Sequence, residues 1–159
     1  MAAVSPAEGG TDSNMAPPDP LAVAKDAFKR GQSRLRVENL EEAIADLARA
    51  VELAPDEIDY AATLAWARFC HAKDKQALAP VTREELGRAI RKSPHPEVAR
   101  FYLGRVERML GRDKEALRHF QEVLEAQPRH AEAAAEVRAI EARVAQAAAK
   151  ESGVFGRKR

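Results

Sequence analysis

The sequence is poor in the residues that several common classes of protein depend on. A single cysteine, Cys70, in 159 residues excludes a framework of internal disulfide bonds and fits a reducing compartment. Aromatic residues make up only 5% of the chain, and a formal net charge of +1 gives no overall field that would attract nucleic acid. No apolar run approaches the roughly 18 residues that a membrane-spanning helix needs. The sequence therefore predicts a cytoplasmic protein that is neither a disulfide scaffold nor a nucleic-acid binder.

Residues 1–19 lack the hydrophobic periodicity of a folded element. They are rich in Ala, Gly, Ser, Pro and Asp, and no Lys or Arg precedes Lys25. A signal peptide would have a positive start and a continuous apolar core, and this segment has neither. Such a composition buries too little apolar surface to offset the entropy lost on ordering. We predict a disordered acidic leader over 1–19, a helical domain over 20–150 and a basic flexible tail over 151–159.

The rest of the chain is rich in strong helix formers and repeats itself. Residues 40–55 align without a gap on residues 113–128, and the segment 82–94 is a weaker middle copy. The distance from Gly31 to Pro55 is 24 residues, and the distance from Gly104 to Pro128 is the same. Arginine outnumbers lysine, which hints at a GC-rich bacterial genome as the source. Three copies in order, each closed by a proline, indicate a helical repeat array.

These copies resemble the tetratricopeptide repeat, a helix–turn–helix unit of about 34 residues. The third copy has most of that family's pattern, in Leu103, Gly104, Ala116, Phe120 and Pro128. Arg100 stands where the family usually has Trp, and Glu107 where it has Tyr. The first copy keeps Gly31, Ala43 and Pro55 and has Leu47 in place of Phe. The middle copy keeps only Leu64 and Pro94 and has Ala65 in place of Gly. The resemblance implies an all-α, helix–turn–helix repeat solenoid of about seven helices.

Local signals predict where the helices begin, end and cross. Gly31 and Gly104 lack a side chain, so the two helices of a hairpin should cross closely there. Asp19 before Pro20 is the pattern of a helix start, and Gly111 suits a turn. The middle repeat has about five extra residues around 72–81. For these we expect a helix that ends near Lys73, an irregular link containing Pro80, and a new helix capped by Thr82 and Glu85.

Residues 131–150 predict a seventh helix with one apolar stripe, formed by Val137, Ile140 and Val144. One apolar and one polar face suit the capping helix that closes the open end of a repeat array.

Residues that would perform catalysis or hold a metal are missing as recognisable groups. None of the four histidines (His71, His95, His119 and His130) is paired with another His or Cys at metal-ligand spacing. His119 and His130 are expected to be solvated. Cys70 and His71 are adjacent, so on a helix they point about 100° apart, outside the reach of a nucleophile–base pair. We expect no enzyme activity, no catalytic residue, no metal and no cofactor.

The resemblance also implies where a partner binds, because in this family the first helix of each repeat lines a concave groove. The groove candidates are Lys25, Phe28, Lys29, Gln32, Arg36, Thr63, Trp66, Cys70, Phe101, Tyr102, Arg105, Arg108 and Met109. Their basic and aromatic character predicts an acidic partner segment with apolar anchors. The alternative for Phe28, Trp66 and Phe101 is that they pack between neighbouring helices.

Chaperone-binding members of this family hold a peptide's terminal carboxylate with a clamp of Lys and Asn side chains and an Arg. The matching positions here are Phe28, Gln32, Thr63, Val98 and Tyr102. The clamp is absent, so we do not expect binding to heat-shock chaperone tails in that way.

The leading hypothesis is therefore a protein–protein interaction adaptor or scaffold that binds a peptide in the groove. The alternative is recruitment to an anionic membrane surface or an assembly through the C-terminal tail, where Val154 and Phe155 precede the basic run 157–159. That membrane contact would be weak, and nucleic acid is not expected as a partner. The oligomeric state stays open, as does the hypothesis that the acidic leader occupies the basic groove of its own chain.

Overall fold

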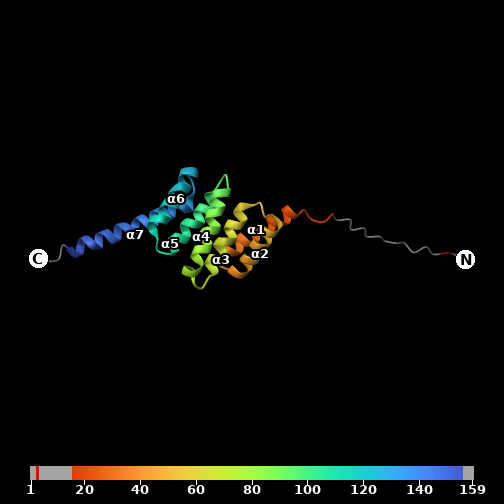
Figure 1. The fold of residues 1–159 in the computed structure, drawn as a ribbon, viewed down its shortest axis with the longest axis horizontal. Helices are drawn as coiled ribbons and strands as arrows, with labels where there is room; N and C mark the ends of the chain where they lie inside the picture. Colours follow the sequence, from red (N-terminus) through yellow and green to blue (C-terminus); the bar gives the residue numbers. More distant parts are fainter. Residues whose placement is uncertain (1–2, 4–15, 156–159) are drawn as a thin grey trace.

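The computed structural model describes residue 3 and residues 16–155, and in this part of the chain it has helices and no strands. The helices are α1 (Pro20–Arg36), α2 (Leu40–Leu53), α3 (Ile58–His71), α4 (Lys75–Lys92), α5 (Glu97–Met109), α6 (Asp113–Ala126) and α7 (Ala131–Phe155) (Figure 1). The all-α repeat fold predicted from the sequence is confirmed. Most of the predicted leader, residues 1–2 and 4–15, and the end of the predicted tail, residues 156–159, lie outside the described residues.

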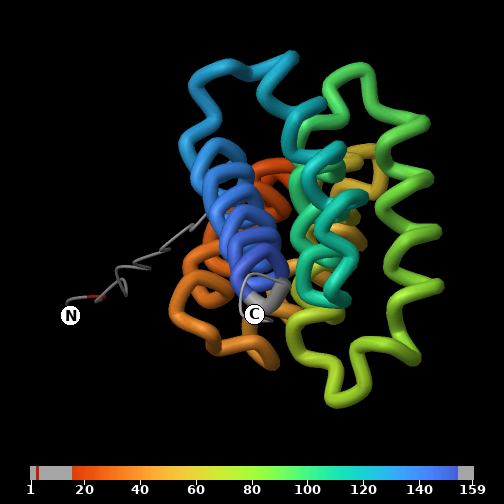
Figure 2. The backbone as a smooth tube through the Cα atoms, turned by 90° about the vertical axis from the view of Figure 1, so that its left-hand side faces the viewer, coloured from red at the N-terminus to blue at the C-terminus, as the bar shows by residue number. Residues whose placement is uncertain are grey.

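Consecutive helices pair into hairpins, and the hairpins stack along the long axis of the molecule (Figures 1 and 2). The hairpins are α1–α2, α3–α4 and α5–α6, and α7 packs against α6 at the end of the stack. The first helices of the hairpins are neighbours, since α3 contacts both α1 and α5. This arrangement lets one row of helices form a continuous inner face.

Two glycines allow the helices of a hairpin to cross at close range. A Cβ atom at Gly31 would lie 2.7 Å from Leu47 Cγ, and one at Gly104 would lie 2.7 Å from Phe120 Cε1. Both glycines are in the first helix of a hairpin, and the large side chain comes from the second. Gly111, in the turn between α5 and α6, has φ +77°, the left-handed region that favours glycine. The structural roles predicted for these glycines are confirmed.

The start of α1 follows the predicted pattern. Asp19 Oδ1 accepts a hydrogen bond from the backbone N–H of Leu21 at 3.1 Å, and Pro20 is the first helical residue. The carboxylate satisfies a backbone donor that has no partner in the first turn.

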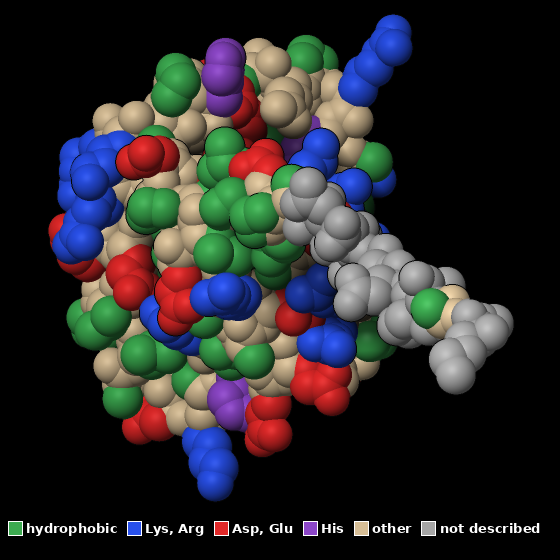
Figure 3. Space-filling model, turned by 90° about the vertical axis from the view of Figure 1, so that its right-hand side faces the viewer, with side chains coloured by type: hydrophobic (Ala, Val, Ile, Leu, Met, Phe, Trp, Pro, Cys, Tyr) green, Lys and Arg blue, Asp and Glu red, His purple; other side chains and the backbone are tan. Residues whose placement is uncertain are grey.

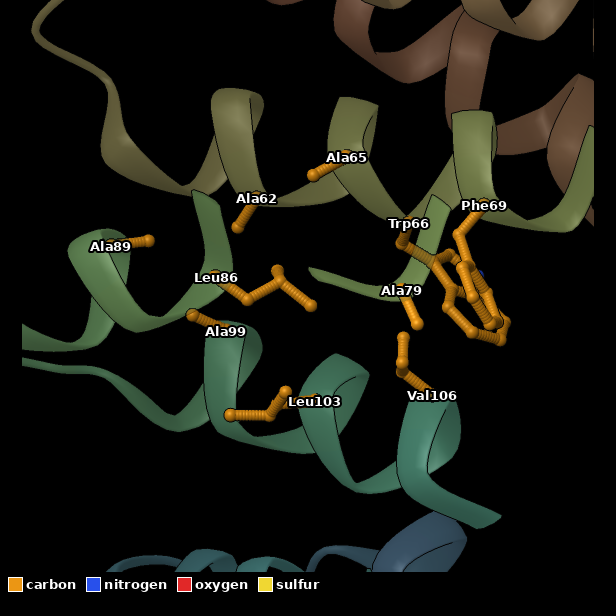
Figure 4. Close-up of a cluster of buried hydrophobic side chains, with 10 residues drawn as sticks. All are labelled: Ala62, Ala65, Trp66, Phe69, Ala79, Leu86, Ala89, Ala99, Leu103 and Val106. Atoms are coloured by element: carbon orange, nitrogen blue, oxygen red, sulfur yellow. The ribbon is translucent and has the colours of Figure 1, made fainter. Parts of the chain in front are cut away.

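The largest core cluster lies between α3, α4 and α5 (Figure 4). Small residues alternate there with large ones, so that the helices approach while rings and branched chains fill the remaining space. Its members are Ala62, Ala65, Trp66, Phe69, Ala79, Leu86, Ala89, Ala99, Leu103 and Val106. Trp66 is thus part of the core, as the packing alternative in the sequence allowed.

The irregular link expected before Thr82 is wrong. Helix α3 ends at His71, and α4 already begins at Lys75, because Asp74 Oδ1 accepts a hydrogen bond from the backbone N–H of Ala77 at 2.9 Å. Pro80 is exposed inside α4, where its missing N–H costs the helix one hydrogen bond. Thr82 is buried, and its hydroxyl donates to the carbonyl of Leu78 at 3.1 Å rather than capping a helix. The extra residues of the middle repeat therefore lengthen α4 at its start.

Helix α7 covers the end of the array with only its first half. Ala133 and Ile140 are buried in a cluster with Phe120 and Val123 of α6. Val144, the third residue of the predicted stripe, is 56% exposed, so the stripe is buried only as far as Ile140. Instead of ending at Lys150, the helix continues to Phe155 and projects beyond the hairpins (Figure 1).

Candidate functional site

A cleft of about 840 Å³ lies on the inner face. The cleft is bordered by the C-terminal halves of α1 and α3 and by the length of α5. The residues that begin α4 and α7 also border it. Its lining residues are Gln32, Leu35, Arg36, Glu38, Leu40, Trp66, Cys70, Lys75, Val98, Phe101, Tyr102, Arg105, Met109, His130 and Glu132. Eight of these are groove candidates from the sequence, namely Gln32, Arg36, Trp66, Cys70, Phe101, Tyr102, Arg105 and Met109.

The other candidates lie outside the cleft, for reasons that only the packing reveals. Phe28, at the middle of α1, stacks on Tyr60 near the start of α3, with ring centroids 4.1 Å apart, and both side chains are half-buried. Thr63 is fully buried and donates its hydroxyl hydrogen to the carbonyl of Asp59 at 2.7 Å. Arg108 forms an ion pair with Glu136 of α7. Lys25 and Lys29 are exposed on earlier turns of α1.

Aromatic side chains form the floor of the cleft. The ring of Tyr102 stacks almost parallel to the Trp66 ring, with an interplanar angle of 8° and centroids 5.6 Å apart. Phe101 is tilted against the ring of His130 at 4.9 Å. Trp66 and Phe101 are only 3% and 7% exposed, so these two rings support the floor more than they offer it to a partner.

Arg105 lies over this floor. Its guanidinium carbon is 4.6 Å from the centroid of the Trp66 ring and 5.8 Å from that of Phe101. Stacking holds the plane of a guanidinium by cation–π attraction while leaving its N–H donors at the edge. Within residues 16–155, no carboxylate lies within ion-pair distance of Arg105. The cleft thus presents an oriented cation whose charge is not neutralised by a described residue.

The remaining charges of the cleft are mixed. Lys75 Nζ donates to the carbonyls of Cys70 and Ala72, at 3.2 and 2.9 Å, and so caps the C-terminal end of α3. Arg36 is exposed at the end of α1. Glu38 and Glu132 contribute acidic groups, which the sequence did not place in the groove.

The groups that carry nucleophilic or acid–base potential are not activated. Burial raises the pKa of the Cys70 thiol to about 11, so it is protonated at neutral pH. Burial also raises the pKa of Tyr102. The expectation that His119 and His130 are solvated is wrong. Burial lowers the pKa of His119, whose Nδ1 is buried, and His130 Nδ1 accepts a hydrogen bond from the backbone N–H of Ala133 at 3.1 Å.

Sequence reasoning missed seven lining residues as groove residues: Leu35, Glu38, Leu40, Lys75, Val98, His130 and Glu132. Leu35 is one position from Arg36 on the same helix end and was within reach of a periodicity argument. Glu38 and His130 come from the connections between helices, and Lys75 is the first residue of α4. The direction of these segments depends on how the hairpins stack. His130 had a usable signal, because a polar residue directly before a helical run indicates an N-cap.

In the part of the chain that the structure describes, no group of three or more His, Cys, Asp or Glu side chains is placed to hold a metal ion. None of the described helices is long and apolar enough to cross a membrane. The side chains of the predicted tail anchor, Val154, Phe155 and 157–159, lie outside the described residues, so the membrane alternative stays a prediction.

No protein-family model matches this sequence, and no curated protein matches it either. Solved structures do share the fold. The first tetratricopeptide-repeat domain of human RPAP3 is 21% identical over 80% of this chain and 95% of its own, with a TM-score of 0.61. The Arabidopsis OM64 tetratricopeptide-repeat domain is 16% identical over 78% of this chain and 98% of its own, with a TM-score of 0.60.

A third similar structure contains a peptide. It is the first tetratricopeptide-repeat domain of Spaghetti (RPAP3) bound to the HSP90 peptide SRMEEVD, 22% identical over 79% of this chain and 95% of its own, with a TM-score of 0.59. At these identities the likeness establishes the fold alone. The chain therefore has the tetratricopeptide-repeat fold that its repeats resembled.

Proposed function

We propose, starting from this tetratricopeptide-repeat fold, that the protein is an interaction adaptor that binds a peptide segment of another protein in the inner cleft. The observation that carries the proposal is Arg105, stacked on Trp66 at 4.6 Å with no carboxylate partner among the described residues. A cation oriented in this way is suited to bidentate recognition of a partner's carboxylate. The peptide held by a domain of the same fold supports a binding role rather than an enzymatic one.

The chemistry of the cleft favours an acidic segment with apolar anchors. Arg36 and Arg105 supply the positive charge, and Met109, which is 50% exposed, supplies adaptable apolar surface beside them. Tyr102 adds an amphipathic ring, the kind of side chain that contributes strongly at interfaces. Glu38 and Glu132 would repel a uniformly acidic chain, so the partner should place its carboxylates near Arg105 and keep them from the two acids.

This mode of binding differs from the terminal-carboxylate clamp. At the clamp positions the chain has Phe28 stacked on Tyr60, Thr63 fully buried and Val98 lining the cleft. None of these three side chains brings a positive charge to a carboxylate. We therefore propose recognition of carboxylates within a segment, centred on Arg105, rather than capture of a chaperone's terminal carboxylate.

A charge reversal at Arg105 tests the proposal. Peptides selected by display against the wild-type protein should be acidic and apolar, and Arg105→Glu should weaken their binding by about tenfold or more, the loss typical of a central interface residue. Fluorescence anisotropy of labelled peptides measures the affinity, and circular dichroism checks the fold.

The matched control is Arg49→Glu on α2, an exposed charge away from the cleft whose only ion pair among the described residues is with Glu52. This variant should bind like the wild type. Selected peptides that bind equally well to the Arg105→Glu protein would move the binding site away from the cleft.

A further inference from the structure

The turn between α1 and α2 has a glutamate where the equivalent turn of the third repeat has a glycine. Glu38 has φ +60°, and among the described residues it is the only one other than glycine with a positive φ. The alignment of residues 40–55 on residues 113–128 places Glu38 on Gly111, which has φ +77°. A residue with a Cβ atom is strained in this left-handed region and glycine is not, so glutamate at this position lowers the stability of the turn.

The two turns have the same backbone arrangement, and they differ in the side chain. The backbone N–H of Glu38 donates to the carbonyl of Leu35 at 3.3 Å. In the same way, the backbone N–H of Gly111 donates to the carbonyl of Arg108 at 3.0 Å. Glycine at position 38 would therefore form this turn at least as well, and the reason for a glutamate must lie in its carboxylate.

The Glu38 carboxylate has no role within the fold that would offset this strain. The side chain is exposed, and within residues 16–155 no cation lies within ion-pair distance of it. The N-cap of α2 is Asn39, so Glu38 does not cap that helix. Glu38 lines the cleft instead. Its charge is close enough to Cys70 to add to the rise in the pKa of that thiol, whose main cause is burial.

The other acid of the cleft has a structural reason for its place. Glu132 lies in the first turn of α7, where the helix dipole favours a negative charge. Glu38 has no such reason in the left-handed turn that it occupies. Of the two acids, Glu38 is therefore the one whose position points to a function in binding.

The surroundings of Glu38 suit a basic side chain. Leu35 and Leu40 line the same cleft and lie within three residues of Glu38 in the sequence. Lys and Arg side chains pack their apolar stems on such surface and place the charged end at a carboxylate. At the N-terminal end of the array, Lys and Arg are interspersed with Asp and Glu, and no large region has one sign (Figure 3). Selection of a partner's charges at this end therefore depends on individual side chains.

We infer that Glu38 is a specificity-determining residue of the cleft and that it binds a lysine or arginine side chain of the partner. The inference rests on the proposed function and narrows it. The partner segment has a basic residue at a fixed place beside the carboxylates that Arg105 binds. A uniformly acidic segment lacks that basic residue and binds less tightly.

The first test measures the strain of the turn in the absence of a partner. Glu38→Gly should melt about 3–6 °C above Glu38→Ala, because both variants lack the carboxylate and only alanine has a Cβ atom in the left-handed region. Gly111→Ala should lower the melting temperature by a similar amount, since a Cβ atom there meets nothing within 4 Å and only the backbone is tested. Circular dichroism measures the melting. Equal melting of Glu38→Gly and Glu38→Ala would overturn the strain on which the inference rests.

The second test measures the preference for a basic residue in the partner. The probe is a short synthetic peptide of alternating Leu and Glu, and it is compared with a set of peptides in which one Glu at a time is replaced by Lys. One peptide of the set should bind the full-length wild type about two- to fivefold more tightly than the parent, the gain of one partly exposed ion pair. Glu38→Lys should reverse this order, because like charges then meet. Fluorescence anisotropy measures the affinities.

The matched control is Glu41→Lys. Glu41 is an exposed acid in the first turn of α2, three positions from Glu38, and it does not line the cleft. This variant makes the same change of charge close to the same turn, and it should keep the wild-type order of the peptides.

The outcomes separate this inference from the proposed function. A parent peptide that binds, with no lysine-containing peptide binding more tightly, overturns the inference and leaves the proposed function standing. A gain that survives in Glu38→Lys, or that is lost equally in Glu41→Lys, also overturns the inference. A set in which no peptide binds the wild type overturns acidic-peptide binding in the cleft and this inference with it. A gain that Glu38→Lys reverses and Glu41→Lys keeps confirms the inference.

Discussion

At the scale of single residues, the closeness of each hairpin depends on the absence of a side chain at one position. Gly31 and Gly104 face Leu47 and Phe120, and both large side chains are fully buried. A packed interior has no free volume for a methyl group at such a contact, so the neighbour would have to leave its rotamer or the helices would have to separate. The glycine and the large side chain therefore function as a pair.

Replacing Gly31 or Gly104 with Ala should lower the free energy of unfolding by about 1–3 kcal/mol, the usual cost of overpacking. Gly87 in α4 is the control, because a Cβ there meets only Arg91 Nη1 at 3.3 Å, the end of a flexible side chain. Gly87→Ala should stabilise the protein by about 0.5–1 kcal/mol through helix propensity. Urea titration followed by circular dichroism measures all three. Equal effects at the three positions would contradict the close-crossing explanation.

At the scale of elements, a buried carboxylate joins the second repeat to the third. Glu107 of α5 is only 4% exposed and stands where the family that the repeats resemble has Tyr. The two carboxylate oxygens of Glu107 accept hydrogen bonds from Arg83 of α4, one from Nε at 2.6 Å and one from Nη2 at 2.9 Å. These hydrogen bonds raise the pKa of Arg83. Arg112, in the turn after α5, is 3.4 Å from the same carboxylate. An ionic contact here takes the place of an aromatic one.

Removing one partner of this pair should cost more than removing both. Arg83→Met leaves the Glu107 carboxylate buried with Arg112 as its remaining cation, and we expect a loss of about 2–3 kcal/mol of stability. The double variant Arg83→Met/Glu107→Leu should regain most of that loss, because no buried charge is then left unpaired. Thermal and urea unfolding of the two single variants and the double variant give the coupling. Additive losses would show that the pair is not coupled.

At the scale of the whole molecule, the array is closed by half a helix. Residues 131–143 of α7 cover α6, and Arg143 forms an ion pair with Asp113 at the start of α6, at 2.8 Å. The described side chains beyond Arg143 are exposed. The end of α7 thus adds length to the molecule without adding to its core.

Two truncations test this division of α7. A chain that ends at residue 144 should unfold at nearly the same urea concentration as the full chain, because it keeps the buried contacts of Ala133 and Ile140. A chain that ends at residue 130 exposes Phe120 and Val123, and it should lose several kcal/mol of stability or fail to fold α6, as expected for an uncapped repeat array. A large loss of stability in the chain that ends at residue 144 would show that the projecting half of α7 contacts another part of the protein.

The sequence by itself determined the repeat, the hairpin glycines and the start of α1, and it named eight of the residues that line the cleft. These features are periodic or local, and each depends on residues that are close in sequence or related by the repeat length. Only the tertiary structure decided where the cleft lies. Phe28 stacks on Tyr60 outside the cleft, and Thr63 is buried. The connection after α1 brings Glu38 to the cleft, and the start of α4 brings Lys75 to it. The position of these side chains depends on how helices that are distant in sequence pack together, and no local pattern encodes that packing. The sequence did not predict the start of α4 or the Arg83–Glu107 contact for the same reason.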